Sequence, residues 1–402
     1  MVRVSVVTPC YNAARFIAAA VESIRAQTLG DWEMLVVDDG STDGSPEIVA
    51  AIGDARVRVL RQANRGPSAA RNAGVRETRG AYVAFLDADD IALPDRLAAQ
   101  AAVLDGEPDL AVVASGYQWI DACGRVLPAE HSWQYPFELN ALRDWLFDCP
   151  LVPSATMIRR SAWAAVGGFE EKLRGGEDWH FWMRLVLSGH RMAWLRQVVC
   201  HYRRLPTGLA SDGARMARDC TEVLHEIISR ADFPAGLSEA ARQGLALRHV
   251  DGAKREFSAG LWRAGRADLA EAIELDAALL TGRPCRIESE LLNAALDPLT
   301  PEPLAFLATA LAHLPDSASW LRERHDETLH LYYVAQAGRS LRARAYRRSA
   351  EHALLAIAQD PAAFGGRHAW RRFARSLLGR ARARATRTAR RGDRRPISAA
   401  HV

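Results

Sequence analysis

Lysine is nearly missing from this sequence, because Lys172 and Lys254 are the only two. Arginine supplies the other basic side chains, and alanine is abundant. This composition indicates the coding bias of a GC-rich genome, so the presence of an arginine is by itself weak evidence for function. The net charge of +4 over 402 residues is small and does not argue for a nucleic-acid-binding protein.

Paired cysteines are also missing. The six cysteines form no Cys-x-x-Cys pair and no Cys/His spacing of the kind that binds zinc. This argues against a zinc-finger class and favours reduced thiols in a cytoplasmic protein.

Long apolar runs are absent as well. No stretch of about 18 apolar residues occurs, so no transmembrane helix is expected. The first residues enter a strand-like pattern at once, without a basic segment followed by an apolar one. We therefore expect a cytoplasmic protein whose only membrane contact is peripheral, on the inner face.

The first half of the chain alternates strand-like and helix-like segments. Apolar strands separated by helices predict an α/β fold with a parallel sheet covered on both faces. A mixed pattern follows, which fits the acceptor side of the same domain. The expected strands are 3–8, 33–37, 57–60, 81–86, 111–115, 154–159 and 198–202, and the expected helices include 14–27, 68–78, 138–147 and 177–188.

Polar residues stand where three of these strands end. They are Thr8 and Tyr11, then Asp38 and Asp39, and then the run 87–90. Ligands of open α/β sheets bind beyond the carboxyl ends of the strands. The sequence therefore predicts that these residues converge on one crevice.

The run Asp87-Ala88-Asp89-Asp90 directly follows an apolar strand. Carboxylates this close repel one another unless a cation neutralises them. Hard divalent ions such as Mn²⁺ or Mg²⁺ take carboxylate oxygens and often bridge them to phosphates. The alternative is an acidic turn that caps the next helix, but the position at a strand end favours a metal site.

Three other polar residues have two interpretations each. Asp39, in Asp38-Asp39-Gly40-Ser41, is either part of a turn or a carboxylate that accepts hydrogen bonds from a nucleotide. Tyr11 either stacks on a base or packs inside the protein. Arg71 either binds a phosphate or base, or forms an ordinary surface ion pair.

Four linked motifs, at 6–12, 36–43, 66–72 and 85–90, resemble those of the family 2 inverting glycosyltransferases with the GT-A fold. Their order and spacing match over roughly the first half of the chain. The resemblance implies a nucleotide-diphosphate-sugar donor and a divalent metal, Mn²⁺ or Mg²⁺. It implies these roles: Thr8, Tyr11, Asp39 and Arg71 around the nucleotide base, Asp87 at the ribose or diphosphate, and Asp89 as metal ligand.

The segment 175–182 resembles the acidic pair that opens a helix in this family and supplies the general base. Inversion needs a base opposite the leaving diphosphate, to take the proton from the attacking hydroxyl. The resemblance assigns that role to Asp178, with Glu177 as the alternative. Without the resemblance, capping of the helix start is the favoured interpretation.

The sequence departs from the family pattern after its last strand. Members often have Tyr-Arg-x-His there, and this chain has Tyr202-Arg203-Arg204-Leu205. Leu205 therefore stands where the histidine is expected. Arg203 or Arg204 is a candidate to clamp phosphate in its place.

Three regions are expected: a GT-A domain over 1–210, a helical domain over 211–365 and an Arg-rich tail over 366–402. Two faintly similar segments, 259–266 and 335–342, favour tetratricopeptide-like hairpins about as much as an ordinary helical bundle. The tail reads either as an amphipathic basic helix on anionic lipid or as a solvated end.

These features predict a hexosyl transferase that moves a sugar from a nucleotide-diphosphate donor, UDP-sugar being favoured, to a hydroxyl acceptor. The acceptor is a saccharide, a lipid-linked molecule or a protein, in the synthesis of a cell-surface polysaccharide or glycolipid. The alternatives are a sugar nucleotidyltransferase, which usually has a Gly-rich loop early in the chain, and a non-catalytic binding module.

Overall fold

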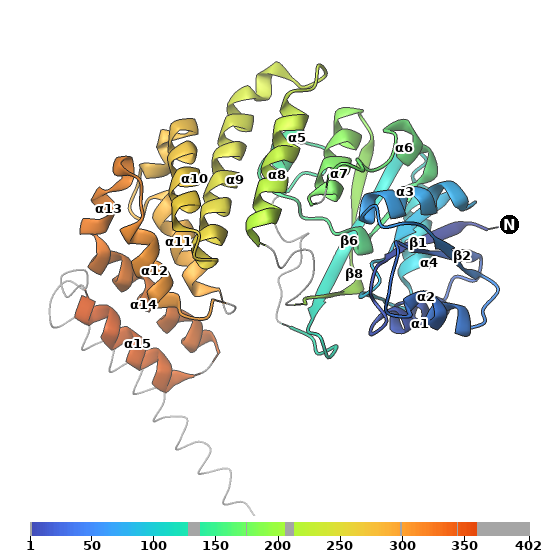
Figure 1. Cartoon of the computed structure of the whole chain (residues 1–402), viewed down its shortest axis with the longest axis horizontal. Helices are drawn as coiled ribbons and strands as arrows, with labels where there is room; N and C mark the ends of the chain where they lie inside the picture. The colour runs from blue at the N-terminus through green and yellow to red at the C-terminus, as the bar shows by residue number, and fades with distance from the viewer. Residues whose placement is uncertain are drawn as a thin grey trace, which may run out of the picture. The chain divides into compact units, whose positions relative to one another are not determined.

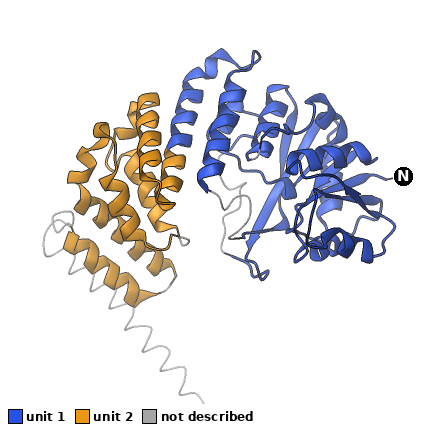
Figure 2. Cartoon of the chain, viewed as in Figure 1, with its two compact units in different colours: residues 1–249 blue, residues 250–402 orange. Residues whose placement is uncertain are grey.

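The computed structural model describes residues 2–127, 137–173, 175–205, 213–297, 300–343 and 345–359. The chain forms two compact units, residues 1–249 and residues 250–402 (Figure 2). The division falls within one long helix, α9, so we describe each unit by itself.

The first unit contains an eight-stranded mixed sheet in the order β3-β2-β1-β4-β7-β6-β8-β5 (Figure 1). The strands β3, β2, β1 and β4 are parallel, and β7 is antiparallel to both of its neighbours. The strands are β1 (Val4–Cys10), β2 (Trp32–Asp38), β3 (Val57–Arg61), β4 (Tyr82–Phe85), β5 (Ile91–Ala92), β6 (Leu110–Ile120), β7 (Thr156–Arg159) and β8 (Arg191–Arg203).

Helices cover both faces of the sheet, as the alternation of strands and helices predicted. In Figure 1, α1 and α2 lie on one face and α3 on the other. The α/β fold class expected from the sequence is thereby confirmed. The helices of the first unit are α1 (Ile17–Arg25), α2 (Ser45–Ala51), α3 (Pro67–Glu77), α4 (Arg96–Gly106), α5 (Leu142–Trp145), α6 (Arg160–Ala165), α7 (Glu177–Leu187), α8 (Gly213–Ile228) and α9 (Ser238–Ser258).

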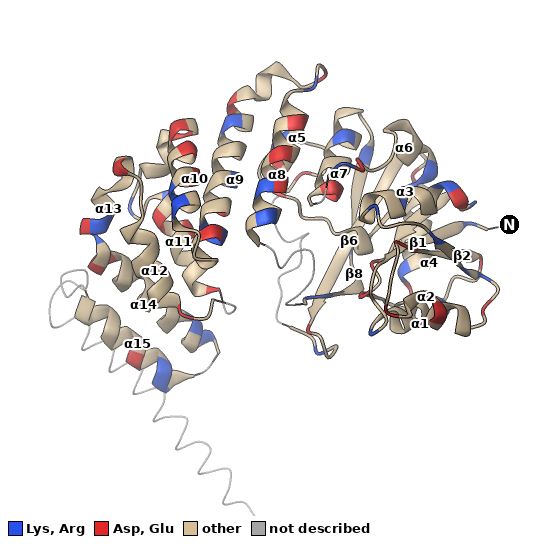
Figure 3. Cartoon of the chain, in the orientation of Figure 1, with Lys and Arg blue, Asp and Glu red and all other residues tan. Residues whose placement is uncertain are grey.

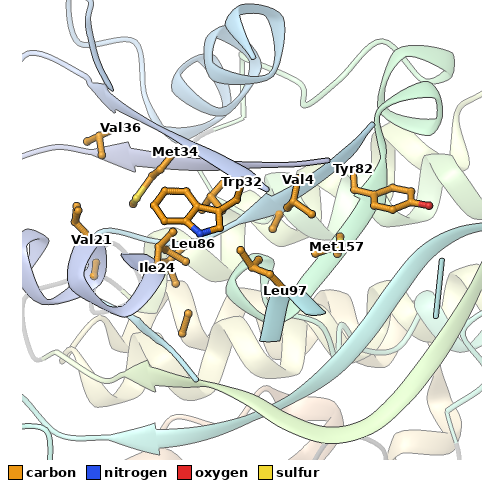
Figure 4. Packing of buried hydrophobic residues seen from close by; sticks show 14 of the residues in the cluster. Val4, Val21, Ile24, Trp32, Met34, Val36, Tyr82, Leu86, Leu97 and Met157 are labelled. Carbon is orange, nitrogen blue, oxygen red and sulfur yellow. The ribbon is translucent and has the colours of Figure 1, made fainter. Parts of the chain in front are cut away.

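The core divides according to the alternation of side chains along the strands. Val4 and Val6 of β1 pack with Met34 and Val36 of β2 against the helices α1 and α4 (Figure 4). The intervening residues of β2 point the other way, where Leu35 and Val37 pack against Ala70 of α3. These strands are apolar on both faces because helices bury both.

The close approach of α3 to the sheet depends on a glycine. A Cβ atom at Gly74 would lie 2.3 Å from a methyl carbon of Val7, so only glycine allows this packing distance. The approach matters for the site, because it carries Arg71, one turn earlier on the same helix, to the strand ends.

The domain boundary predicted at residue 210 lies in segment 206–212, outside the described residues. The helix α8, which follows this segment, packs against α7 within the first unit. The division into three regions stays a prediction, and the tail 366–402 also lies outside the described residues.

The second unit is helical throughout its described part. The segments 259–266 and 335–342 hold different places in it: the first contains the turn before α10, and the second lies at the end of α14. Across the described ranges, no helix has the length and apolar character needed to cross a membrane. The α-helices after α9 are α10 (Trp262–Leu275), α11 (Arg286–Leu296), α12 (Pro303–Ala312), α13 (Trp320–Glu323), α14 (His325–Arg342) and α15 (Tyr346–Gln359).

Candidate functional site

The residues predicted to line one crevice follow the carboxyl ends of β2, β1 and β4, which are neighbours in the sheet. Cys10 at the end of β1 is in register with Asp38 at the end of β2. The amide of Asp39 donates to the carbonyl of Cys10 at 2.8 Å, so the two strand ends stay together beyond the ladder. The segments that carry Tyr11, Asp39 and Asp87 therefore leave the sheet at one edge.

Arg71 joins this edge to the start of α7. Its Nη2 donates to Asp87 Oδ1 and its Nη1 donates to Glu177 Oε1, both at 2.7 Å. The guanidinium is 5% exposed and lies over the ring of Phe169, 5.5 Å from the centroid. Burial alone would lower the pKa of Arg71, but the charges of Asp87 and Glu177 outweigh it and raise the pKa. Arg71 is thus a buried double ion pair and not a surface one.

Asp39 holds the loop that leads into α3. Its Oδ1 accepts from the Gln62 amide at 2.7 Å and from the backbone N–H of Arg65 at 2.9 Å. Its Oδ2 accepts from the backbone N–H of Gly66 at 2.7 Å. The carboxylate is buried, and these bonds place the N-terminus of α3, and with it Arg71. The turn interpretation applies to Asp38, whose Oδ1 accepts from the amide of Ser41 at 3.1 Å.

Thr8 and Tyr11 differ sharply in exposure. Thr8 is completely buried, and its hydroxyl has no hydrogen-bond partner among the described residues. Tyr11, just past the end of β1, is 53% exposed. Only Tyr11 of this pair presents a face to which a planar ligand has open access.

The run 87–90 divides into three environments. Asp87 pairs with Arg71, and its amide donates to the Ser154 hydroxyl at 2.9 Å. Asp90 is fully buried, and its Oδ1 accepts from the backbone N–H of Arg203 at 2.8 Å. Burial, together with the charges of Asp87 and Asp89, raises the pKa of Asp90. Asp90 therefore ties the acidic run to the end of β8.

Asp89 is half-buried, and within the described ranges no other residue forms an ion pair or side-chain hydrogen bond with its carboxylate. Burial and, next to it, the negative charge of Asp87 raise the pKa of Asp89 to about 6. A cation bound between these two carboxylates would relieve that repulsion. The role of Asp89 as a metal ligand stays a prediction.

The donor set decides which ion fits. Across the described part of the chain, no group of three or more His, Cys, Asp and Glu side chains is arranged to hold a metal. Asp89 with Asp87 offers carboxylate oxygens only. Mg²⁺ is usually held by one or two carboxylates together with substrate phosphates and water, so these residues fit a hard divalent cation that shares its ligands with a diphosphate.

The start of α7 presents two acids in different states. Glu177 is paired with Arg71. Asp178 is half-buried, and its Oδ1 accepts from the Trp179 amide at 2.7 Å. Burial, followed by the charge of Glu177, raises the pKa of Asp178 to about 7, although Arg71 opposes the shift. Because Glu177 is already paired with Arg71 and a carboxylate with a raised pKa would suit a general base, Asp178 stays the predicted base and Glu177 the alternative.

After β8, Leu205 stands where members of the family often have a histidine. Leu205 is half-buried there, and His201 pairs in register with Ile91 of β5. The guanidinium of Arg203 donates to backbone carbonyls, and that of Arg204 stacks on the Trp119 ring at 3.9 Å. Among the described residues, neither guanidinium forms an ion pair with an acidic side chain. The role of Arg203 or Arg204 as a phosphate clamp stays a prediction.

Two residues beneath the site were missed at the sequence level. Ser154 accepts from the amide of Asp87, and Arg96 donates to the carbonyls of Phe85 at 2.6 Å and Thr156 at 3.1 Å. Arg96 is completely buried, and burial lowers its pKa. No local motif marks either residue, because their partners come from other strands.

Comparisons with known proteins point to one family. The model of "Glycosyl transferase family 2" matches residues 5–167. "Putative teichuronic acid biosynthesis glycosyltransferase TuaG" of Bacillus subtilis is 30% identical over 231 residues, which cover 56% of this chain and 88% of TuaG. "Succinoglycan biosynthesis protein ExoO" of Rhizobium meliloti is 50% identical over 95 residues, which cover 23% of this chain and 27% of ExoO.

Other relatives are longer proteins. An "Uncharacterized glycosyltransferase" of Rickettsia felis is 33% identical over 185 residues, 46% of this chain. The match spans only 30% of the length of that relative.

Solved structures share the fold. TarS 1-349 of S. aureus in complex with UDP has a TM-score of 0.52 at 22% identity, covering 80% of this chain and 91% of TarS 1-349. The mannosyltransferase PcManGT of Pyrobaculum calidifontis, in complex with GDP-Man and Mn²⁺, has a TM-score of 0.51 at 22% identity, covering 79% of this chain and 87% of PcManGT. These likenesses confirm the GT-A-like α/β unit followed by helices.

The family match, the relative that this chain covers over most of its length, and the fold agree with the four motifs read from the sequence. The chain belongs to glycosyl transferase family 2.

Proposed function

We propose that this protein transfers a hexosyl group from a nucleotide-diphosphate donor, a UDP-sugar by preference, to a hydroxyl acceptor with inversion. One observation carries the proposal: Arg71 bonds to both Asp87 and Glu177. This double pair brings the acidic loop after β4 to the helix that starts with Asp178. A donor-side carboxylate pair and a candidate base thereby belong to one site.

On the donor side, we assign the nucleotide base to the surface formed by Tyr11 and the loop that Asp39 holds, with Thr8 behind this surface. Arg71 acts from beneath this surface, because its guanidinium is buried and both of its ends are occupied. The solved GT-A-like structures include complexes with UDP and with GDP-Man, which supports a nucleotide-diphosphate donor.

Asp89, assisted by Asp87, would hold Mn²⁺ or Mg²⁺ beside the diphosphate. The free carboxylate of Asp89 and its raised pKa support this assignment. When bound, such an ion offsets the negative charge that builds up on the departing diphosphate.

On the acceptor side, Asp178 takes the proton of the attacking hydroxyl. The acceptor oxygen bonds to the anomeric carbon, the bond from that carbon to the diphosphate breaks, and the nucleoside diphosphate leaves. Glu177 supports the base indirectly, because its pair with Arg71 anchors the first turn of α7.

The names of two relatives support a biological setting. TuaG and ExoO are named for the biosynthesis of teichuronic acid and succinoglycan. We therefore place this protein in the cytoplasmic synthesis of a surface polysaccharide or glycolipid, with a saccharide, lipid-linked or protein acceptor.

A donor screen tests the proposal. The purified chain with Mn²⁺ is mixed with a panel of UDP-, GDP- and dTDP-sugars, and released nucleoside diphosphate is measured. One donor should be hydrolysed slowly, and both EDTA and Asp89→Asn should stop the release. If no donor causes release or a thermal shift, the chain is a non-catalytic module. Pyrophosphate release from a nucleoside triphosphate and a sugar phosphate would instead establish the nucleotidyltransferase.

A further inference from the structure

Arg203, the last residue of β8, contacts the acidic loop from two sides. Its backbone N–H donates to Asp90 Oδ1 at 2.8 Å, and its Nε donates to the carbonyl oxygen of Asp89 at 2.7 Å. The same residue therefore holds the loop through both its main chain and its side chain, although 113 residues separate it from Asp90.

The rest of the guanidinium is held just as firmly. Nη1 donates to the carbonyl of Asp121, just beyond β6, at 2.9 Å. The guanidinium carbon lies 4.8 Å from the centre of the Phe16 ring, just before α1. Arg203 thus fastens the acidic loop to two further segments of the first unit.

These contacts lie next to the Asp89 carboxylate in the chain. They occupy the carbonyl of Asp89 and the side chain of the next residue, Asp90, whereas no other described residue forms a hydrogen bond or ion pair with the Asp89 carboxylate, on which Arg203 acts only through its charge. Holding the carbonyl of Asp89 and the side chain of the residue that follows limits the positions that the Asp89 carboxylate can take. Groups behind a metal ligand commonly orient it in this way.

We propose that Arg203 is a positioning residue, which holds Asp89 in the orientation that a divalent cation and the donor diphosphate require, and does not itself bind the phosphate. The inference rests on the proposed function and deepens it.

The test compares Arg203→Ala, Arg203→Lys and a control, Arg191→Ala, at the opposite end of β8. Arg191 is a surface residue, 3.7 Å from Glu107 and remote from the loop. Binding of Mn²⁺ in the presence of UDP, without acceptor, is followed by the EPR signal of free Mn²⁺. Nucleotide release from the donor is then measured as a function of Mn²⁺ concentration.

Arg203→Ala should raise the Mn²⁺ concentration for half-saturation about 10- to 100-fold. Saturating Mn²⁺ should restore most of the release rate, because Arg203 touches neither donor nor acceptor in this proposal. Arg203→Lys keeps the charge and one donor but loses the planar fork, so its shift should be smaller. Arg191→Ala should match the parent protein.

The outcomes separate the two proposals. If Arg203→Ala binds Mn²⁺ like the parent protein, the positioning role is overturned. Unchanged Mn²⁺ affinity with weaker UDP binding would make Arg203 a phosphate ligand and would overturn it as well. If Arg203→Ala does not fold, Arg203→Lys decides by the same criterion. A parent protein that binds no Mn²⁺, or an unaffected Asp89→Asn, would instead contradict the metal site itself.

Discussion

The two units bury polar side chains for different purposes. In the second unit these groups tie helices together: the Thr328 hydroxyl donates to the buried Glu288 carboxylate at 2.8 Å, and the Ser349 hydroxyl donates to the Ala337 carbonyl at 2.9 Å. In the first unit, buried Arg71, Asp90 and Glu177 instead crowd around the strand ends, with like charges held close together. That arrangement costs stability locally, which is typical of a functional site.

Their surfaces differ too. Most of the large apolar side chains that are exposed among the described residues belong to the second unit, whose helices also carry charges of both signs (Figure 3). We therefore expect the chemistry to reside in the first unit, whereas the second unit carries most of the exposed apolar side chains among the described residues. The exposed residues are Tyr11 and Val126 in the first unit and Leu261, Leu304, Trp320, Val334, Leu341, Leu354 and Leu355 in the second.

The largest expected effect tests the concentration of chemistry in the first unit. Asp178→Asn removes the proposed base, and general base catalysis is worth about 10²- to 10⁴-fold. Transfer from the active donor should fall by that factor, while the Kd of the donor stays the same. Steady-state rates and a donor titration measure the two quantities.

Glu177→Gln is the matched comparison for that variant. Its principal loss should be the ion pair with Arg71, so it should lower the melting temperature more than Asp178→Asn does. If Asp178→Asn keeps normal transfer while Glu177→Gln abolishes it, Glu177 is the base.

The next effect concerns the double ion pair of Arg71 with Asp87 and Glu177. Arg71→Met leaves Asp87 and Glu177 without their cation, and removing one partner of a buried ion pair costs about 3 to 5 kcal/mol. We expect the lower end, about 3 kcal/mol, because the Asp87 side chain is still 24% exposed. Urea unfolding measures it.

Arg76→Met, on the same helix, is the control. The Arg76 side chain is 53% exposed and lies 3.9 Å from Glu171, so the free energy of unfolding should change by less than about 0.5 kcal/mol. Equal losses in the two variants would show that Arg71 is an ordinary surface arginine after all.

A change of one pH unit should alter the transfer rate less than the substitution Asp178→Asn does. Asp178 acts as a base only when it is deprotonated, and its pKa is raised to about 7 by burial. The value of kcat/KM should therefore fall about tenfold per pH unit below pH 7 and level off above it. An acidic limb near pH 4 would mean that Asp178 is solvated like a free carboxyl.

Stability should move in the opposite direction. The folded pKa of Asp178 lies above its unfolded value of about 4, so the folded state binds the proton more tightly. This contribution is present below pH 4 and is lost as the pH rises through 7. The melting temperature of Asp178→Asn relative to the parent protein should therefore rise between pH 5 and pH 8.

The smallest effect on activity is expected for a substitution in the second unit. Thr328→Val removes the hydroxyl that donates to the fully buried Glu288, which costs about 1 to 3 kcal/mol of stability. The rate per folded molecule should not change. A change in kcat without unfolding would show that the helices of the second unit take part in the reaction.

The sequence predicted much of the site and little of its internal arrangement. The strand-end positions of Tyr11, Asp39 and the run 87–90 follow from local patterns, and the structure places them at one edge of the sheet. The different environments of Asp87, Asp89 and Asp90 were not predictable, because they depend on Arg71, on an open side and on Arg203, respectively. Four adjacent residues give no local sign of which partner each will meet.

The alternation of strands and helices, the apolar faces of the first strands and the order of the four motifs can be read from the amino-acid sequence alone. These properties depend on spacing within short windows, where backbone geometry alone sets which side chains share a face. The pairing of Arg71 with Glu177, 106 residues away, and the contacts of Arg203 with the acidic loop arise only in the folded chain. A buried charge takes the partner that packing brings within hydrogen-bond distance, and no short window of sequence contains that information.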